Sequence, residues 1–302
     1  MTGEAESSLN AVRRVTWLGL GANLALSAIK FAAGFLGHSR VLIADAVHSL
    51  SDLATDTAVL IGSRYWQRPA DKDHPNGHGK IEALVALLIA LALLLVSLGL
   101  IRDAVISLYG IAEGNVIPVP KEIALVVAIV SIVVKEYLYR VTLKTAHRAK
   151  SSALAANAAH HRSDALSSIP AALSVGTALA FGQKWTFLDP VGTIVVAILI
   201  LFSVREILRD PLHTLIDQGE TEEILDRIER ISQEIPDIKT IHDIRTRPLG
   251  SGHFAADLSI HVDPNMSVLK AHALSHRLTA TIKSRIHGIV DVVVHIEPEK
   301  QV

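Results

Sequence analysis

The chain has 302 residues, of which 50% are hydrophobic but only 4% aromatic, and the apolar excess comes in long runs typical of membrane helices rather than of a soluble core. The formal net charge of −1 lacks the basic excess that nucleic-acid binding requires, so we expect no nucleic-acid partner. The sequence has 15 histidines and no cysteine, so any metal must be held by imidazoles and carboxylates, and disulfides are excluded.

Six apolar segments follow one another along the first two thirds of the chain. A hydrocarbon core about 30 Å thick needs roughly 20 helical residues, and each segment reaches that length. The N-terminus lacks the charged region, short apolar stretch and cleavage site of a secretory signal, so the first segment is expected to remain as a span. The predicted spans are residues 15–36, 41–62, 81–108, 117–141, 153–181 and 187–208.

Lysine and arginine lie mainly on one side of these predicted spans. They concentrate in the loops 64–80 and 140–150 and beside the first and last spans, whereas the connections on the other side hold few. By the positive-inside rule, this asymmetry predicts that both termini are cytoplasmic.

A different pattern begins at residue 210. Residues 221–235 and 267–286 have the periodicity of amphipathic helices, and three segments alternate like strands: 239–249, 253–263 and 291–298. The order αββαβ predicts a small ferredoxin-like α+β domain with helices on one face of a three-stranded sheet. We therefore expect two domains, a six-span transport domain over 1–209 and a soluble domain over 210–302.

Two of the predicted spans carry ionisable residues at helical spacing. Such groups are costly in hydrocarbon unless they face a partner or a water-filled cavity, so they are functional candidates. The fifth span offers His160 and Asp164, four positions apart. The second span offers four residues on one helical face: Asp45, His48, Asp52 and Asp56.

Each of the two spans contains the pattern His-x-x-x-Asp. Two imidazoles and two carboxylates, from His48, Asp52, His160 and Asp164, would form a four-ligand site suited to tetrahedral Zn²⁺. The alternative is that these groups only pair with one another to hold the helices together, but the repeated motif favours a metal path. His161 points about 100° away from its neighbour and is not expected to bind the metal. Asp45 and Asp56 are expected to line the cavity or to be solvated.

Histidines also cluster outside the spans. In the loop after the second span, Asp71, His74 and His78 lie close together, although a solvated polar loop would look similar. In the C-terminal domain, histidines in or beside all three predicted strands could converge with a glutamate on the last strand. These are His242, His261 and His295, with Glu297.

Several segments together resemble the cation diffusion facilitator family, over nearly the whole chain after residue 12. They are ADAVHSLSD in the second span, HPNGHGKIEAL opening the third, HHRSDALSS in the fifth, and IHDIRTR with DVVVHIEP in the tail. The resemblance implies a homodimeric, proton-coupled exporter of divalent metal in the inner (plasma) membrane, with six spans and a cytoplasmic ferredoxin-like domain. It implies no enzyme activity and no catalytic cofactor, since the metal is substrate and regulator.

The resemblance also assigns sites. The transport site falls on the four His and Asp residues of the second and fifth spans, and the loop site on Asp71, His74 and His78. A salt bridge that locks the family's dimer falls on Lys80 and Asp217. The tail site at the dimer contact falls on His242, His261, His272, His295 and Glu297.

Bacterial zinc and iron exporters of this family often have Asp where His48 stands, whereas the form with two His and two Asp resembles zinc-selective members, so zinc is the leading substrate. Fe²⁺, Co²⁺, Cd²⁺ and Mn²⁺ remain possible substrates. In the tail site, Glu297 stands where relatives often carry Asp. Two other classes fit the sequence less well. A non-transporting metal sensor or assembly scaffold would not explain two buried motifs, and a metalloenzyme would need a motif such as HExxH, which the sequence lacks.

Overall fold

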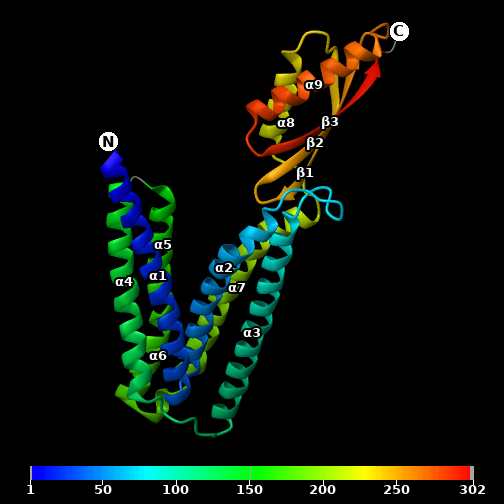
Figure 1. The fold of residues 1–302 in the computed structure, drawn as a ribbon. Helices are drawn as coiled ribbons and strands as arrows, with labels where there is room; N and C mark the ends of the chain where they lie inside the picture. The colour runs from blue at the N-terminus through cyan, green and yellow to red at the C-terminus, as the bar shows by residue number, and fades with distance from the viewer. Residues whose placement is uncertain (1, 150, 300–302) are drawn as a thin grey trace. The chain divides into compact units, whose positions relative to one another are not determined.

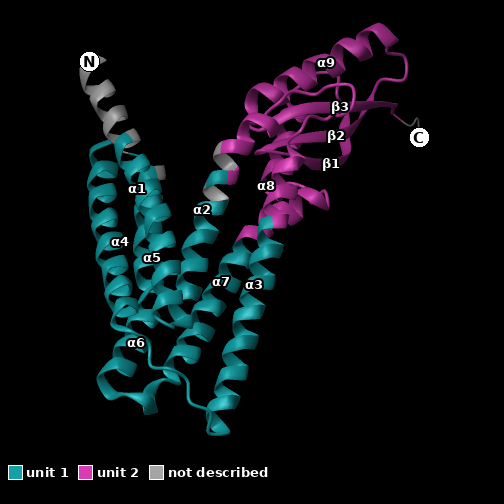
Figure 2. Cartoon of the chain, turned by 60° about the horizontal axis from the view of Figure 1, so that its bottom comes forward, with its two compact units in different colours: residues 1–57, 89–206 teal, residues 58–88, 207–302 magenta. Residues whose placement is uncertain are grey.

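The computed structural model describes residues 2–149 and 151–299, which divide into two compact units. Residues 1–57 and 89–206 form the first unit and residues 58–88 and 207–302 the second (Figure 2). The predicted domain boundary between residues 209 and 210 stays a prediction, because helix α7 (Leu188–Leu215) runs through it without interruption.

The first unit is built from helices. These are α1 (Thr2–Leu36), α2 (Arg40–Trp66), α3 (Lys80–Ala112), α4 (Glu122–Ala149), α5 (Ser152–Ser167), α6 (Ile169–Phe181), the short 3₁₀ helix η1 (Gln183–Trp185) and α7. Three of them continue into the second unit: α2, α3 and α7. Helices α1, α4 and α5 lie side by side (Figure 1). Among the described residues, four stretches are long and apolar enough to cross a membrane: Arg14–Leu36, Lys80–Ala112, Asn157–Phe181 and Gln183–Leu215. Helices α2 and α4, with 27 and 28 residues, are of spanning length but richer in ionisable side chains.

The six predicted spans thus correspond to six helical segments, with two differences. The fourth begins at Glu122 rather than at residue 117, because Pro118 and Pro120 cannot continue the hydrogen bonding of a helix. The fifth is not one helix but α5 and α6, which meet at Ser168 just before Pro170 in the first turn of α6. A proline at a helix start is well tolerated, so the sequence begins a new helix there.

Small residues are buried between these helices, and large apolar residues face outward. Ala44, Ala128 and Ala178 are fully buried, whereas Leu88 and Phe202 are mostly exposed. In a soluble protein this pattern would leave the apolar surface in water. In a bilayer it is favourable, because small residues allow close helix packing and the large ones meet lipid. The pattern therefore supports a membrane-spanning role for the helical part.

The C-terminal part has the predicted order αββαβ. Its elements are α8 (Glu222–Gln233), β1 (Thr240–Gly250), β2 (His253–Val262), α9 (Val268–Arg285) and β3 (Ile289–Pro298). The sheet order is β1-β2-β3, with β1 antiparallel and β3 parallel to the central β2. Ile228 of α8 and Leu278 and Ile282 of α9 are fully buried in one core with Leu258 and Ile260 of the sheet. The predicted ferredoxin-like domain is confirmed.

Candidate metal centres

Helices α2 and α5 bring the predicted transport residues together. One ligand atom each from His48, Asp52 and Asp164 lie within 4.8 Å of one another. The fourth residue, His160, places its Nε2 3.8 Å from Asp52 Oδ2 and 3.6 Å from Asp164 Oδ1. Because each His-x-x-x-Asp pair spans about one helical turn, both members of a pair point toward the same place.

The cluster combines buried groups with one accessible group. The side chain of Asp164 is 3% exposed, whereas that of His160 is 46% exposed. Two buried atoms, His48 Nδ1 and Asp52 Oδ2, have no hydrogen-bond partner among the residues that the structure describes. Unsatisfied buried imidazole and carboxylate atoms are unfavourable unless they bind something, and these atom types suit a divalent transition metal.

Two buried lysines that are not among the predicted site residues flank the cluster. Lys135 of α4 places its Nζ 2.6 Å from Asp164 Oδ2. Lys30 of α1 places its Nζ 2.9 Å from Asp45 Oδ2, and all four side chains are at most 3% exposed. The available signal was a lysine inside an apolar span, which requires a buried counter-charge.

The Lys30–Asp45 pair is tied to the break between α5 and α6. Lys30 Nζ donates to Ser49 Oγ at 3.0 Å and to Ser168 Oγ at 3.1 Å. Ser168 in turn donates to Asp45 Oδ1 at 3.0 Å. Asp45 is thus paired with the ammonium group of Lys30, which comes from another helix. The side chain of Asp56 lies outside the described part of the chain.

His161 lies apart from the cluster, against α1. Its side chain is 2% exposed, and neither ring nitrogen has a hydrogen-bond partner within the described ranges. A Cβ added at Gly19 would lie 3.1 Å from His161 Nε2, so the glycine makes room for the ring. The structure does not bring this histidine together with the four predicted ligands.

The loop residues form a second group, in which ligand atoms of Asp71, His74 and His78 lie within 4.8 Å of one another. Asp71 Oδ1 accepts the backbone N–H of His74 at 2.7 Å and that of Asp73 at 3.0 Å. The His74 N–H is the main cause that lowers the pKa of the Asp71 carboxyl below its ordinary value. His78 Nε2 lies 3.4 Å from Asp71 Oδ2. The loop is therefore shaped around an ionised aspartate with two imidazoles beside it.

The three strands converge on a third group, formed by His242, His261 and Glu297. The rings of His242 and His261 are stacked with centroids 4.6 Å apart. Glu297 reaches the Nε2 of both rings at 3.6 Å, and His261 is its register partner on the neighbouring strand. His295 Nε2 also lies 3.6 Å from Glu297 Oε1.

His272 is placed elsewhere. On α9, its Nε2 lies 3.1 Å from His276 Nε2, one helical turn away. It does not belong to the His242–His261–Glu297 group. Within one chain, the structure therefore does not bring His272 together with the other predicted tail ligands.

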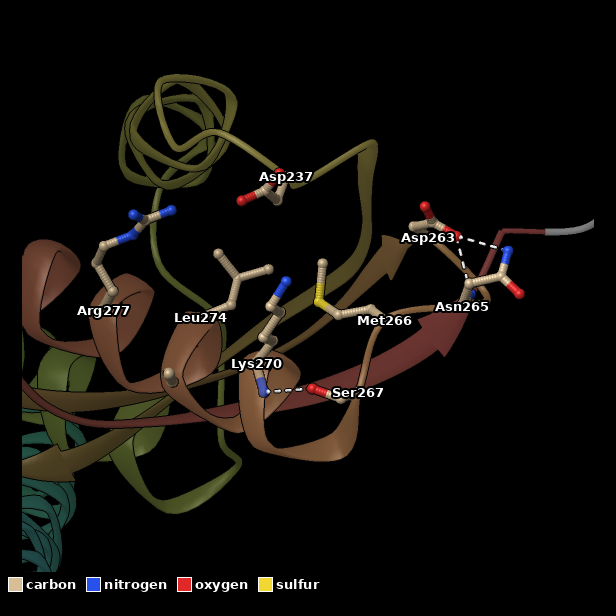
Figure 3. Close-up of a pocket in the computed structure, with 9 residues that line it drawn as sticks. Asp237, Asp263, Asn265, Met266, Ser267, Lys270, Leu274 and Arg277 are labelled. Carbon is tan, nitrogen blue, oxygen red and sulfur yellow. Dashed lines mark hydrogen bonds between the residues drawn. The ribbon is translucent and has the colours of Figure 1, made fainter.

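A pocket of about 770 Å³ lies beside the start of α9 in the same domain (Figure 3). Asp237, Asp263, Lys270 and Arg277 give it charges of both signs, and Asp263 accepts the backbone N–H of Asn265 at 2.8 Å. None of the described residues that line the pocket belongs to the three metal-ligand groups. The pocket is therefore separate from these candidate sites.

A buried His and Asp cluster between long helices, joined to a small α+β domain, is the arrangement expected of a membrane transporter for cations. Comparison with known proteins agrees: "Cation efflux transmembrane domain" matches residues 16–216, and "Cation efflux protein, cytoplasmic domain" matches residues 221–299. The chain belongs to the cation efflux, or cation diffusion facilitator, family.

Similar proteins span nearly the whole chain. The manganese efflux system protein MneP of Bacillus subtilis is 29% identical over 95% of this chain and 96% of its own length. Metal tolerance protein C1 of Arabidopsis thaliana is 34% identical over 93% of this chain and 61% of its own length. A solved structure of a MamM C-terminal domain variant is 26% identical, covering 27% of this chain and 100% of that chain with a TM-score of 0.26.

Proposed function

We propose that this chain is a proton-coupled antiporter that exports a divalent transition metal from the cytoplasm, with Zn²⁺ as the leading substrate. The observation that carries the proposal is the convergence of His48, Asp52, His160 and Asp164 inside the membrane-spanning part. Two carboxylates balance the charge of a divalent ion. Two imidazoles favour zinc over the harder ions, which prefer oxygen ligands.

Proton coupling follows from the chemistry of the proposed ligands. An imidazole must be neutral to bind a metal, and it titrates close to physiological pH, so protons and metal compete for the same atoms. In the proposed cycle, metal binds from the cytoplasm, the helices rearrange by alternating access, and protons from the other side displace it. His160 is suited to this exchange because it is the accessible member of the cluster.

Manganese is the main rival substrate, since the relative MneP is named a manganese efflux protein. Fe²⁺, Co²⁺ and Cd²⁺ are also compatible with nitrogen and oxygen ligands. Substrate choice therefore has to be measured with several ions under one condition.

We also propose that residues 210–302 form a cytoplasmic, metal-responsive dimerisation domain, that the protein is a homodimer in the inner (plasma) membrane, and that both termini are cytoplasmic. The matched description of residues 221–299 as a cytoplasmic domain supports this placement. Metal held by His242, His261 and Glu297 would bias the equilibrium between two dimer arrangements by binding one more tightly.

Flux into liposomes tests the transport proposal. Purified protein is reconstituted with an imposed pH gradient, and uptake of Zn²⁺, Mn²⁺, Fe²⁺ and Cd²⁺ is followed beside His160→Ala and Asp52→Ala. We expect gradient-dependent Zn²⁺ flux that both substitutions abolish, whereas His287→Ala, an exposed histidine outside the three groups, leaves it unchanged. Absence of flux in the unmutated protein, or flux in the two site variants equal to that of the unmutated protein, would contradict transport through this site and favour a metal-binding sensor or scaffold.

Cysteine labelling tests the orientation, because the chain has no cysteine of its own. Glu113→Cys in the α3–α4 connection and His253→Cys at the start of β2 each introduce one exposed thiol. In intact inverted vesicles, whose outer face is cytoplasmic, we expect a membrane-impermeant maleimide to label His253→Cys and to label Glu113→Cys only after the vesicles are opened. Labelling of both variants in intact vesicles would contradict the proposed topology.

A further inference from the structure

Lys135 places a positive charge directly against the candidate transport site. It lies on the buried face of α4, which otherwise consists of small, hydroxyl or apolar residues. Its side chain is 1% exposed, and its Nζ lies 2.6 Å from Asp164 Oδ2. A hydrogen bond of this length between ionised partners is strong. The ammonium group is therefore held at one specific carboxylate.

Asp164 faces the lysine and the other predicted ligands at the same time. Its Oδ2 accepts the hydrogen bond from Lys135 Nζ, while its Oδ1 lies 3.6 Å from His160 Nε2. It also belongs to the compact group with His48 and Asp52. A metal bound by Asp164 would therefore share this carboxylate with the ammonium group, or displace it.

The charges in the site give this arrangement a direction. Asp52 and Asp164 together balance one divalent ion, so the lysine adds an excess positive charge once the metal has entered. Charges in a buried region interact strongly because little solvent screens them. In the empty site the same lysine compensates a carboxylate that would otherwise be buried with excess negative charge. Lys135 thus stabilises the empty site and disfavours the loaded one.

We propose that Lys135 is a tethered cation of the transport site: its ammonium group binds Asp164 when the site is empty and weakens metal binding enough for release. The inference rests on the proposed function, because it needs Asp164 to bind the transported metal. It assigns to α4 a part in setting metal affinity, although the predicted ligands lie on α2 and α5.

A purely structural role for the pair predicts the opposite change in affinity. If Lys135 only joins α4 to α5, its removal leaves Asp164 unsupported, and metal binding becomes weaker or stays the same. If Lys135 is a tethered cation, its removal tightens binding. The direction of the change in Kd therefore separates the two roles.

Metal binding to the purified full-length protein in detergent tests the proposal. All variants are made in a parent protein that carries His74→Ala and His261→Ala, which disable the loop and tail groups. A chromophoric chelator competes with the protein for Zn²⁺ or Mn²⁺, and the competition gives the Kd. We expect Lys135→Met to lower the Kd for Zn²⁺ about tenfold, which corresponds to about 1.4 kcal/mol. Lys135→Arg keeps the charge and should stay within about threefold of the parent, a difference under about 0.7 kcal/mol. In liposomes, Lys135→Met should also lower the maximal flux, because release becomes slower.

Lys30→Met is the matched control for removing a buried lysine. It deletes the partner of Asp45, which is not one of the four predicted ligands, so it should reduce thermal stability and lower the Kd much less than Lys135→Met does. If Lys135→Met gives no folded protein, Lys135→Gln carries the same expectation, since it removes the charge and keeps an N–H donor. An unchanged or higher Kd in a folded neutral variant overturns the tethered-cation proposal. Metal binding in the parent that survives Asp52→Ala instead overturns the transport site itself.

Discussion

The Nζ atom of Lys80, the first residue of α3, lies 2.6 Å from Oδ1 of Asp217, two residues beyond the end of α7. The two side chains are 41% and 52% exposed. An exposed ion pair contributes roughly 0–1 kcal/mol to stability, because solvent and salt screen it. The pair predicted from the family resemblance is therefore formed within one chain, but its geometry alone does not make it a strong link.

We expect Lys80→Met and Asp217→Asn each to lower the free energy of unfolding by less than about 1 kcal/mol. Asn is chosen because Asp217 has a φ of 54°, a conformation that Asn tolerates better than Ala. If the pair also locks the active dimer, flux in liposomes will fall several-fold in both variants, whereas Lys80→Arg, which keeps the charge, will retain most of it. Flux that follows only the small stability change would show that the pair is an ordinary surface contact.

Asp71 gives the loop group a defined pH dependence. Its pKa lies below the ordinary value of 3.8, chiefly because the His74 N–H binds the ionised form. For a carboxyl whose pKa is lower in the folded protein, the stabilisation is complete above the unfolded pKa and is lost as the pH falls through the folded pKa. Acidification from pH 7 to 5 should therefore leave Asp71 ionised. Loss of metal from the loop in that range would come from other groups.

Carboxyl NMR of ¹³C-aspartate-labelled protein checks this expectation. The signal that disappears in Asp71→Asn is assigned to Asp71, and its midpoint should lie below 3.8. A midpoint at or above that value would mean that the hydrogen bond from His74 is not formed in solution. Metal binding at the loop should be weakened by Asp71→Asn throughout the range from pH 5 to 7.

The tail group should control stimulation by metal rather than transport itself. His261 contacts Glu297, stacks on His242, and accepts or donates a 2.7 Å hydrogen bond with Thr240 Oγ1. We expect His261→Ala to reduce the metal-induced rise in thermal midpoint of the full-length protein, since a ligand stabilises in proportion to RT ln(1 + [L]/Kd). Metal stimulation of flux should weaken, while a residual flux remains. His253→Ala, an exposed histidine of the same domain outside this group, is the control.

Local periodicity was enough to predict much of this structure. The C-terminal elements alternate or repeat clearly enough that α8, α9 and all three strands begin within a few residues of their predicted positions. The same holds for the His-x-x-x-Asp pairs, because helical geometry alone puts both members on one face. The break between α5 and α6 was missed, although Pro170 was a visible signal for it.

Contacts between helices could not be predicted in this way. The sequence shows that Lys30 and Lys135 lie in apolar segments, but the carboxylate that each one meets is on another helix and depends on packing. His272 shows the same limit, since its assignment to the tail site came from resemblance and the structure places it beside His276. Periodicity identifies the face of an element, whereas the partner of that face is a property of the whole fold.

His48 offers the sharpest test of substrate choice. It is 9% exposed, and its Nδ1 has no hydrogen-bond partner in the described residues, so it can contribute one imidazole nitrogen to the site. His48→Asp replaces that nitrogen ligand with a carboxylate oxygen, which suits harder ions such as Mn²⁺ better than Zn²⁺. The added negative charge should also tighten the binding of every divalent ion. We expect the ratio of Mn²⁺ to Zn²⁺ flux to rise about tenfold, a change of about 1.4 kcal/mol in relative preference.

His74→Asp, the same substitution in the loop group, should leave this ratio unchanged if selection occurs inside the membrane. A ratio that shifts equally in both variants would place the selective step in the loop instead.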